Sequence, residues 1–279
     1  MLNSLRNKIL FFALIPLLAA YTIGFFLSLA REKKTLTENV NKFMYHEASS
    51  LAQIIRKELK TIETIAYSNS EFVEYSEDVT KEEAVAMLKT NFGKSDLLLG
   101  SRIALEPSMK KGKRFMVSII KLDGNISVTN AEEKIDYTAP DEKWYQIPKK
   151  TLKPYWDIPY VGREAGKLVS RVNIPIIKNG KFVGVSSCKF EILKFKGLRT
   201  DVGYLSLALI IIDKEGRFIY HPTEKRIIEG NKIFNQSSSS INVEDQNELG
   251  KRMLSGKQGK KILRYTDGSD LLWSYYSPV

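Results

Sequence analysis

The first apolar positions of the chain form one uninterrupted run. Residues 9–30 carry no charged side chain, and a helix of about 20 apolar residues crosses the roughly 30 Å hydrocarbon core of a bilayer. The run predicts a transmembrane helix over residues 9–30, after a short N-terminus at residues 1–8. A cleaved signal peptide is the alternative, because Ser28-Leu29-Ala30 resembles a cleavage site, although the apolar core of such a peptide spans only about 7–15 residues.

The segment that follows has the spacing of a long amphipathic helix. Its apolar residues recur at gaps of three and four with one gap of eight, at Leu36, Val40, Phe43, Leu51, Ile55, Leu59, Ile62 and Ile65. Neither Gly nor Pro occurs between residues 31 and 68, so we predict one stalk helix over residues 31–68 that continues from the membrane span. Thr80-Lys81-Glu82-Glu83 forms a capping box and predicts the start of a second helix, which Gly93 closes.

Farther along, apolar and polar positions alternate in short runs rich in β-branched residues. Turn residues separate these runs at 123–125, 179–180 and 213–216, with the sequences Asp-Gly-Asn, Asn-Gly and Asp-Lys-Glu-Gly. Each turn is expected to join two strands of an antiparallel hairpin. Helices at the front of the chain and antiparallel strands after them predict the α+β fold class, with one more short helix at residues 243–254.

The hairpins fall into two groups on either side of residues 197–203. A short amphipathic segment marks this boundary, and we expect one lobe over residues 69–200 and a second over residues 201–279, both attached to the stalk helix. Four serines at 237–240 predict a surface loop. The final residues, 271–279, have the pattern of a strand with no cap after it, so we expect the second lobe to be incomplete and the chain to be a fragment of a longer protein.

The composition narrows the classes of function. A formal net charge of +11 indicates an anionic partner, but the Lys and Arg residues are scattered rather than gathered in a basic helix, which argues against nucleic acid. Cys188 is the one cysteine, and His46 and His221 are the two histidines. We expect no metal site, no cofactor and no catalytic triad, and the sequence lacks a Gly-rich phosphate loop and a nucleophile elbow.

The charges around the apolar span leave its orientation open. Arg6 and Lys8 precede it, and Arg31, Lys33 and Lys34 follow it, so the positive-inside rule does not decide. A short N-terminus before a large domain favours a cytoplasmic N-terminus, with the bulk of the chain extracytoplasmic and anchored in the inner or plasma membrane.

Several short motifs follow one another along the chain: Trp144-Tyr145, Tyr155-Trp156 with Pro159-Tyr160, the turn from Pro175 to Val185, and Gly216 with His221-Pro222. In this order, after an N-terminal span and a long helix, they resemble the double Cache sensor domain of bacterial transmembrane receptors. The resemblance implies two stacked Cache (PAS-like) lobes with antiparallel sheets on one stalk helix. The membrane-distal lobe, residues 69–200, would bind the ligand, and residues 201–279 would be the membrane-proximal lobe. A second span and a cytoplasmic output module, such as a phosphatase, kinase, diguanylate cyclase or chemoreceptor module, would follow residue 279.

The resemblance also implies a ligand site. In relatives that bind amino acids, a Tyr, an Arg, a Trp-Tyr pair, a later Tyr and an Asp surround the ligand, and the aromatic positions correspond to Tyr137, Trp144, Tyr145 and Tyr160. Glu142 replaces the Arg that holds the ligand carboxylate, and Lys189 replaces the Asp that holds the ligand amine. An α-amino group would meet a cation at this position, so an amino acid is disfavoured as the ligand.

Strand alternation suggests which residues take over the binding of a ligand. Arg171 and Asn173 share one face of their strand, and if Lys189 points inward from the next strand, Arg171 can point the same way. A guanidinium and an ammonium suit a carboxylate or a phosphate, so we expect a small organic anion. The expected ligand-binding residues are Trp144, Tyr160, Arg171, Lys189, Tyr137, Tyr145, Trp156 and Asn173. Three alternatives stay open: the aromatic residues pack only in the core, Arg171 and Lys189 lie on a solvated edge if the strand phase is off by one residue, or Glu142 pairs with Lys189.

These expectations combine into one functional hypothesis. The chain is expected to be a membrane-anchored sensory domain, not an enzyme, that binds a small ligand outside the cytoplasm and signals across the membrane. The apolar stripe of the stalk helix predicts a homodimer. A membrane-anchored extracytoplasmic hydrolase and a ligand-free structural domain are the alternatives.

Overall fold

The structure, a computed structural model, describes residues 9–122, 124–129, 135–162, 166–198, 207–234, 240–267 and 271–279. The chain divides into two parts, Met1–Ser50 and Leu51–Val279, and the long helix α2 (Ile15–Tyr75) contributes to both. The α+β fold class expected from the sequence is confirmed, because long helices come first and the strands named in the described residues pair antiparallel.

The N-terminal part is helical throughout its described residues. A short π-helical segment, η1 (Leu10–Leu14), leads into α2, whose first turns are apolar and exposed. Among the described residues, this is the one helix long and apolar enough to cross a membrane, and no residue of its apolar window is buried. The helix also runs without a break through residues 31–68, as the absence of Gly and Pro predicted.

Helix α2 extends beyond residue 68, where the sequence placed the end of the stalk. The helix continues to Tyr75, because its buried stripe extends through Asn69, Ser70 and Val73 and keeps it packed on the sheet. Helix α3 (Lys81–Phe92) follows after a short connection. The Thr80 hydroxyl accepts a hydrogen bond from the Glu83 backbone N–H at 3.2 Å, and the Glu83 carboxylate accepts one from the Thr80 N–H at 2.9 Å, so the predicted capping box is confirmed.

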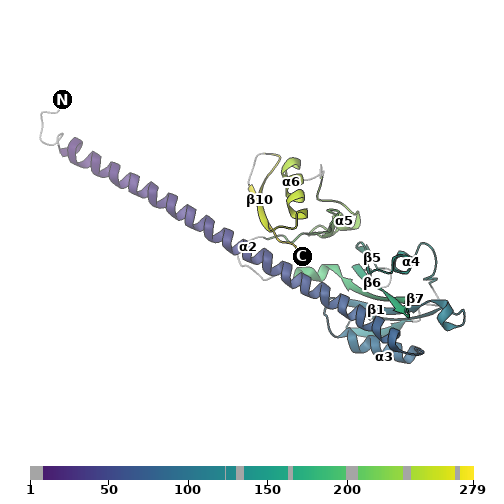
Figure 1. The fold of residues 1–279 in the computed structure, drawn as a ribbon. Helices are drawn as coiled ribbons and strands as arrows, with labels where there is room; N and C mark the ends of the chain where they lie inside the picture. Colours follow the sequence, from purple (N-terminus) through teal and green to yellow (C-terminus); the bar gives the residue numbers. More distant parts are fainter. Residues whose placement is uncertain are drawn as a thin grey trace. The chain divides into compact units, whose positions relative to one another are not determined.

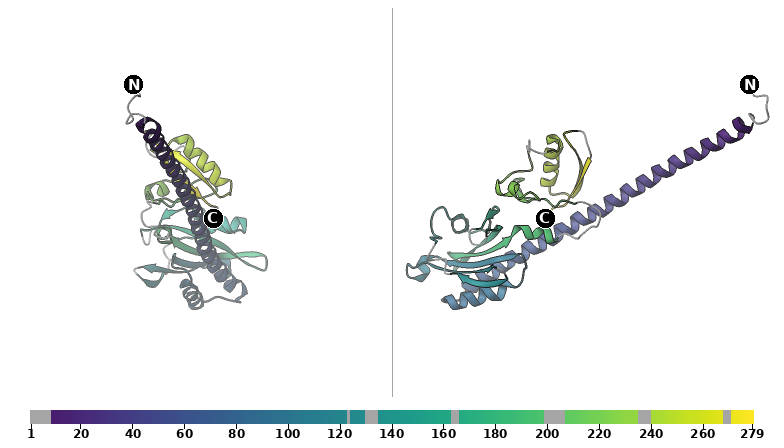
Figure 2. Two further views of the ribbon diagram at one scale, coloured as in Figure 1. Left: turned by 90° about the vertical axis from the view of Figure 1, so that its left-hand side faces the viewer. Right: turned by 180° about the vertical axis from the view of Figure 1, so that it is seen from behind.

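One antiparallel sheet forms the centre of the part that begins at Leu51. Its seven strands are β1 (Leu98–Leu105), β2 (Phe115–Leu122), β3 (Asn125–Thr129), β4 (Tyr155–Trp156), β5 (Tyr160–Val161), β6 (Leu168–Lys178) and β7 (Lys181–Glu191). The order is β3-β2-β1-β7-β6-β4, with β5 also paired to β6. Helices α2 and α3 cover one face, and α4 (Lys143–Thr151) lies over the other (Figures 1 and 2). Every residue of the central strand β1 is therefore buried.

The predicted turns join the strands as expected. Asn179 and Gly180 both have positive φ, 53° and 72°, which is the type I′ geometry that matches the twist of the β6–β7 hairpin. Strands β2 and β3 pair from Leu122 and Asn125 onward, although Asp123 of that turn lies outside the described residues. Short 3₁₀ helices, η2 (Pro107–Lys110) and η4 (Ile192–Leu198), follow β1 and β7.

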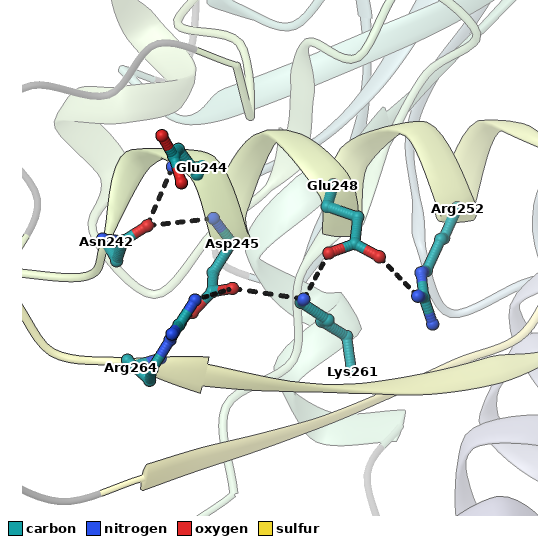
Figure 3. A network of polar contacts seen from close by, with 7 residues as sticks. All are labelled: Asn242, Glu244, Asp245, Glu248, Arg252, Lys261 and Arg264. Carbon is teal, nitrogen blue, oxygen red and sulfur yellow. Dashed lines mark hydrogen bonds and ion pairs between the residues drawn. The ribbon is translucent and has the colours of Figure 1, made fainter.

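The C-terminal residues form two small two-stranded sheets with helices packed against them. The elements are β8 (Ile211–Ile212), β9 (Phe218–Tyr220), α5 (Glu224–Ile228), α6 (Val243–Leu254), β10 (Gly259–Arg264) and β11 (Leu271–Tyr276). The Gly216 N–H donates to the Asp213 carbonyl at 2.9 Å, which confirms the third predicted turn, and α6 has the predicted bounds. Asn242 caps α6, and Asp245 and Glu248 of this helix bind cations of β10 (Figure 3). Most of the predicted boundary at 197–203 and of the loop at 237–240 lies outside the described residues.

A chain of polar side chains crosses the core between α3, α2 and the sheet. The Asn91 amide donates to the Asn69 side-chain oxygen at 2.8 Å, and the Asn69 amide donates to the Ser101 hydroxyl at 3.1 Å. The Ser101 hydroxyl lies 3.4 Å from the Cys188 sulfur. All four residues are buried, and the hydrogen bonds offset the cost of placing amides in the core.

Candidate ligand-binding site

Two of the predicted cations lie side by side on the sheet face beneath α4. Arg171 of β6 pairs directly with Lys189 of β7, and directly paired residues point to the same face of a sheet. The strand phase expected from the sequence is therefore confirmed. Ser187 of β7 pairs with Asn173 on one side and with Arg102 of β1 on the other, which brings these side chains to the same face. Lys189 and Arg102 are only 5% and 6% exposed, so their charges are largely removed from water.

Arg171 is held on several sides. Its Nε donates to Asp157 Oδ2 at 2.7 Å. Its guanidinium carbon lies 5.4 Å from the centroid of the Trp144 ring and 5.1 Å from that of the Tyr160 ring, distances typical of cation–π contacts. No described residue accepts a hydrogen bond from the two terminal Nη atoms. The guanidinium is thus oriented, with two donors available for a planar acceptor.

Asp157 is a member of the site that the sequence did not single out. Its Oδ1 accepts from the Asn173 amide at 3.1 Å, while Oδ2 accepts from Arg171. The Asn173 side-chain oxygen in turn accepts from the Ser187 hydroxyl at 2.7 Å. Asn173 therefore acts as a bridge between Asp157 and β7 rather than as an open ligand contact.

Trp144 lies at the start of α4 and faces both guanidinium groups. Its indole N–H donates to Glu142 Oε2 at 2.8 Å, which fixes the ring plane. The guanidinium carbon of Arg102, a second residue missed by the sequence, lies 5.1 Å from the Trp144 ring centroid. Glu142 therefore binds the indole, which gives it a role other than the expected alternative of an ion pair with Lys189.

Tyr137 and Tyr145 form a wall behind Trp144. Both are fully buried, and their ring centroids lie 5.1 Å apart in an edge-to-face arrangement. The Tyr137 hydroxyl donates to the Leu105 carbonyl at 2.7 Å, and the Tyr145 hydroxyl donates to Glu106 Oε2 at 2.8 Å. Burial, together with the neighbouring Glu106 carboxylate, raises the pKa of Tyr145 well above its ordinary value, so this hydroxyl stays protonated. These two residues support the site from behind.

Trp156 is not brought together with the other predicted residues. It pairs with Val172 and so points to the sheet face opposite to Arg171 and Asn173. Its ring centroid lies 6.0 Å from that of Phe190, and the residue is 37% exposed. Trp156 packs on the rim of the core beneath the sheet, whereas Tyr160 lies on the same face as Arg171.

A small cavity lies among residues of β1, β2, β3 and β7. Gly100, Arg102, Ser118, Thr129, Ser187 and Lys189 contribute to its lining. Its volume is about 10 Å³, which is room for roughly one water molecule. An organic ligand therefore requires side chains around the cavity to move.

The segment that carries this arrangement matches a family of sensor domains. Residues 84–196 fit the model of the first PDC sensor domain of methyl-accepting chemotaxis protein-like proteins. This segment is a PDC sensor domain. The PDC domain contains all eight predicted ligand-binding residues, which lie between Tyr137 and Lys189. No curated protein sequence matches the chain.

Solved structures with the fold of this chain are also sensor domains. The extracellular domain assigned to a histidine kinase, soHK1S-Z6, has a TM-score of 0.70 at 16% identity, with 88% of this chain and 91% of that chain covered. The periplasmic sensory domain of the Campylobacter jejuni chemoreceptor Tlp1 has a TM-score of 0.62 at 16% identity, with 86% and 90% covered. The sensory domain of the chemoreceptor Tlp3 from the same organism, solved with isoleucine bound, has a TM-score of 0.56 at 14% identity, with 84% and 87% covered. These similarities concern the fold, and with the PDC match they point to a sensory rather than a catalytic domain.

Proposed function

We propose that the chain is a membrane-anchored extracytoplasmic sensor whose PDC domain binds a small organic carboxylate on the sheet face beneath α4. The observation that carries this proposal is Arg171, whose Nε is bound by Asp157 while its two Nη donors have no acceptor among the described residues. A guanidinium oriented in this way can donate two parallel hydrogen bonds to the two oxygens of a carboxylate. The apolar window at the start of α2 supports the membrane anchor.

The charges of the site favour an anion that lacks an amine. Arg102, Arg171 and Lys189 lie on one sheet face, and Asp157 is already engaged by Arg171 and Asn173. The chemoreceptor Tlp3 was solved with isoleucine bound. An amino acid in the same place here would bring its ammonium group close to buried cations, and this repulsion is strong where water is excluded. Simple carboxylic acids avoid it.

Binding would require a rearrangement of the side chains around the site. The cavity holds roughly one water, so a carboxylate bound by Arg171 would need neighbouring side chains to move, and the ligand stabilises whichever arrangement it binds more tightly. The change can pass from β6 to α2, because the Ser70 hydroxyl donates to the Pro175 carbonyl at 3.3 Å. In the proposed mechanism, α2 then transmits this conformational change towards the membrane as part of a dimer.

Thermal denaturation of the detergent-solubilised chain tests this function. Acetate, lactate and succinate are compared with glycine, putrescine and chloride at equal ionic strength. We expect stabilisation by a carboxylate in the wild type and in the control Lys214→Gln, whose side chain is exposed. Arg171→Lys keeps a cation beside Asp157 but removes the paired guanidinium donors, so it should abolish the stabilisation by carboxylates. Stabilisation by amines alone, or an undiminished carboxylate shift in Arg171→Lys, would contradict the proposal.

A further inference from the structure

A second concave site lies on the other side of the sheet from the carboxylate site, along α2. Its volume is about 350 Å³, and it lies between α2 and Lys94, the second residue after the C-terminal end of α3. This volume is within the range of small-molecule sites, about 300–1,000 Å³. Its polar lining residues are Lys57, Lys60, Thr61, Thr64, Ser68 and Lys94.

Three ammonium groups share this groove, and a single ion pair offsets them. Lys60 binds the Glu63 carboxylate at 2.7 Å, on the same helix. The Lys57 ammonium makes no hydrogen bond or ion pair with any described residue, although the Lys57 backbone carbonyl accepts from Thr61, and the Lys94 ammonium binds an amide oxygen rather than a carboxylate. Neighbouring like charges repel one another, and an anion among them removes that repulsion.

The threonine hydroxyls leave the lysines as the main donors in the groove. Thr61 donates to the Lys57 carbonyl at 2.9 Å and Thr64 donates to the Lys60 carbonyl at 2.8 Å, so both hydroxyl protons are used within α2. The methyl groups of these threonines and the side chain of Ile65 give the floor of the groove an apolar character. Recognition of an anion therefore depends on the ammonium groups.

Lys94 is positioned by the buried polar chain. Its Nζ donates to the Asn91 side-chain oxygen at 2.5 Å. Asn91 is itself fixed by its bond to Asn69, and Asn69 by its bond to Ser101 of β1. A lysine anchored to the core in this way loses less side-chain entropy when it binds an anion than a free surface lysine does.

We propose that this groove is an anion-binding site, distinct from the carboxylate site, for a compact oxyanion of two or more negative charges. Inorganic phosphate is the simplest member of this class. Lys57 and Lys94 supply the direct contacts, because neither is neutralised by a carboxylate of the described residues, and Lys60 adds its charge at the rim. The proposal does not depend on the identity of the ligand at Arg171.

Isothermal titration of the detergent-solubilised full chain with phosphate tests the site. Ionic strength is kept constant with chloride, and the variants are Lys57→Gln, Lys94→Gln and the control Lys214→Gln. All three changes lie on exposed side chains, so folding should be retained. We expect saturable binding to the wild type and to Lys214→Gln, and binding about tenfold weaker in each groove variant, as for the loss of one charge-assisted hydrogen bond.

Arg171→Lys separates this site from the carboxylate site. Phosphate binding should be unchanged in Arg171→Lys, even where that variant no longer responds to carboxylates. Absence of saturable phosphate binding to the wild type overturns the proposal. Equal losses in Lys214→Gln and in the groove variants overturn it too, because they would indicate a response to total charge.

Discussion

Asp245 joins α6 to β10 through an almost wholly buried carboxylate. The residue is only 3% exposed. It accepts hydrogen bonds from the Arg264 backbone N–H at 3.1 Å, from Arg264 Nε at 2.8 Å and from Arg264 Nη2 at 3.1 Å, and it pairs with Lys261 Nζ at 3.1 Å (Figure 3). The change Asp245→Asn keeps the shape and one acceptor oxygen but removes the charge.

The expected loss of stability follows from these contacts. Removing one member of a buried ion pair costs about 3–5 kcal/mol when its partner is left without compensation. Here Arg264 is largely exposed and Lys261 keeps its contact with Glu248, so both cations stay partly solvated or paired. We therefore expect a loss of about 2 kcal/mol, below the range for an uncompensated partner. In a domain of this size, 2 kcal/mol corresponds to a decrease in Tm of about 4–8 °C.

The effect should depend on pH in a defined direction. Hydrogen bonds from Arg264, and then from Lys261, hold the pKa of Asp245 in the folded state well below its ordinary value of 3.8. A lowered folded-state pKa gives a contribution to stability that is complete above the unfolded-state pKa and is lost as the pH falls towards the folded-state pKa. The difference between the wild type and Asp245→Asn should thus be constant near neutral pH and shrink below about pH 4.

Thermal unfolding by circular dichroism between pH 3 and 7, with hydrogen exchange of the α6 and β10 amides, measures both effects. Glu248→Gln is the matched control, because this carboxylate also binds Lys261 but its side chain is 44% exposed. It should cost clearly less stability than Asp245→Asn, because water screens an exposed ion pair. If the two variants lose equal stability at pH 7, or if the Asp245→Asn deficit grows as the pH falls, the reasoning from burial and charge is refuted.

Two further predictions concern the core of the PDC domain. In Gly184→Ala the new Cβ would lie 2.4 Å from the Ala104 carbonyl oxygen, so β1 and β7 must separate, and urea unfolding should show a loss of about 2–4 kcal/mol. Gly197→Ala, where no atom lies within 4 Å of the new Cβ, is the control and should change stability by less than about 0.5 kcal/mol; equal losses would contradict the prediction. Burial raises the pKa of Cys188 to about 12, so the thiol should react with a disulfide reagent at pH 8 only after unfolding in urea, and rapid reaction of the native chain would show that the core around Ser101 opens readily.

Local chemistry accounts for most of what the sequence predicted correctly. The capping box at Thr80, the Asn179-Gly180 turn and the bounds of α6 depend on residues only a few positions apart. Such signals can be read without knowledge of the tertiary structure. The shared face of Arg171 and Lys189 was also predicted, but through the resemblance that places Lys189 inward, because the burial along the two strands does not alternate regularly.

The remaining site residues depend on contacts that the local sequence does not show. Trp156 belongs to the two-residue strand β4, which is too short for alternation to define its face. Arg102 lies in β1, whose eight residues are all buried, so no alternation of buried and exposed positions assigns its side chain to one face of the sheet. Asp157 gains its role only when Arg171, fourteen positions later, folds back beside it. Its position between Tyr155-Trp156 and Pro159-Tyr160 was the one available signal.

The buried amides of α2 and α3 restrict how α2 can move against the sheet. Asn69 is bonded to both Asn91 and Ser101. A slide by one helical turn, about 5.4 Å, would break both bonds and leave amide groups without partners in the core. The amide hydrogen bonds therefore fix the register of α2 against the sheet and permit only tilts and rotations small enough to keep these bonds intact. A signal from the proposed carboxylate site should consequently move the sheet and this segment of α2 as one body, rather than drive one past the other.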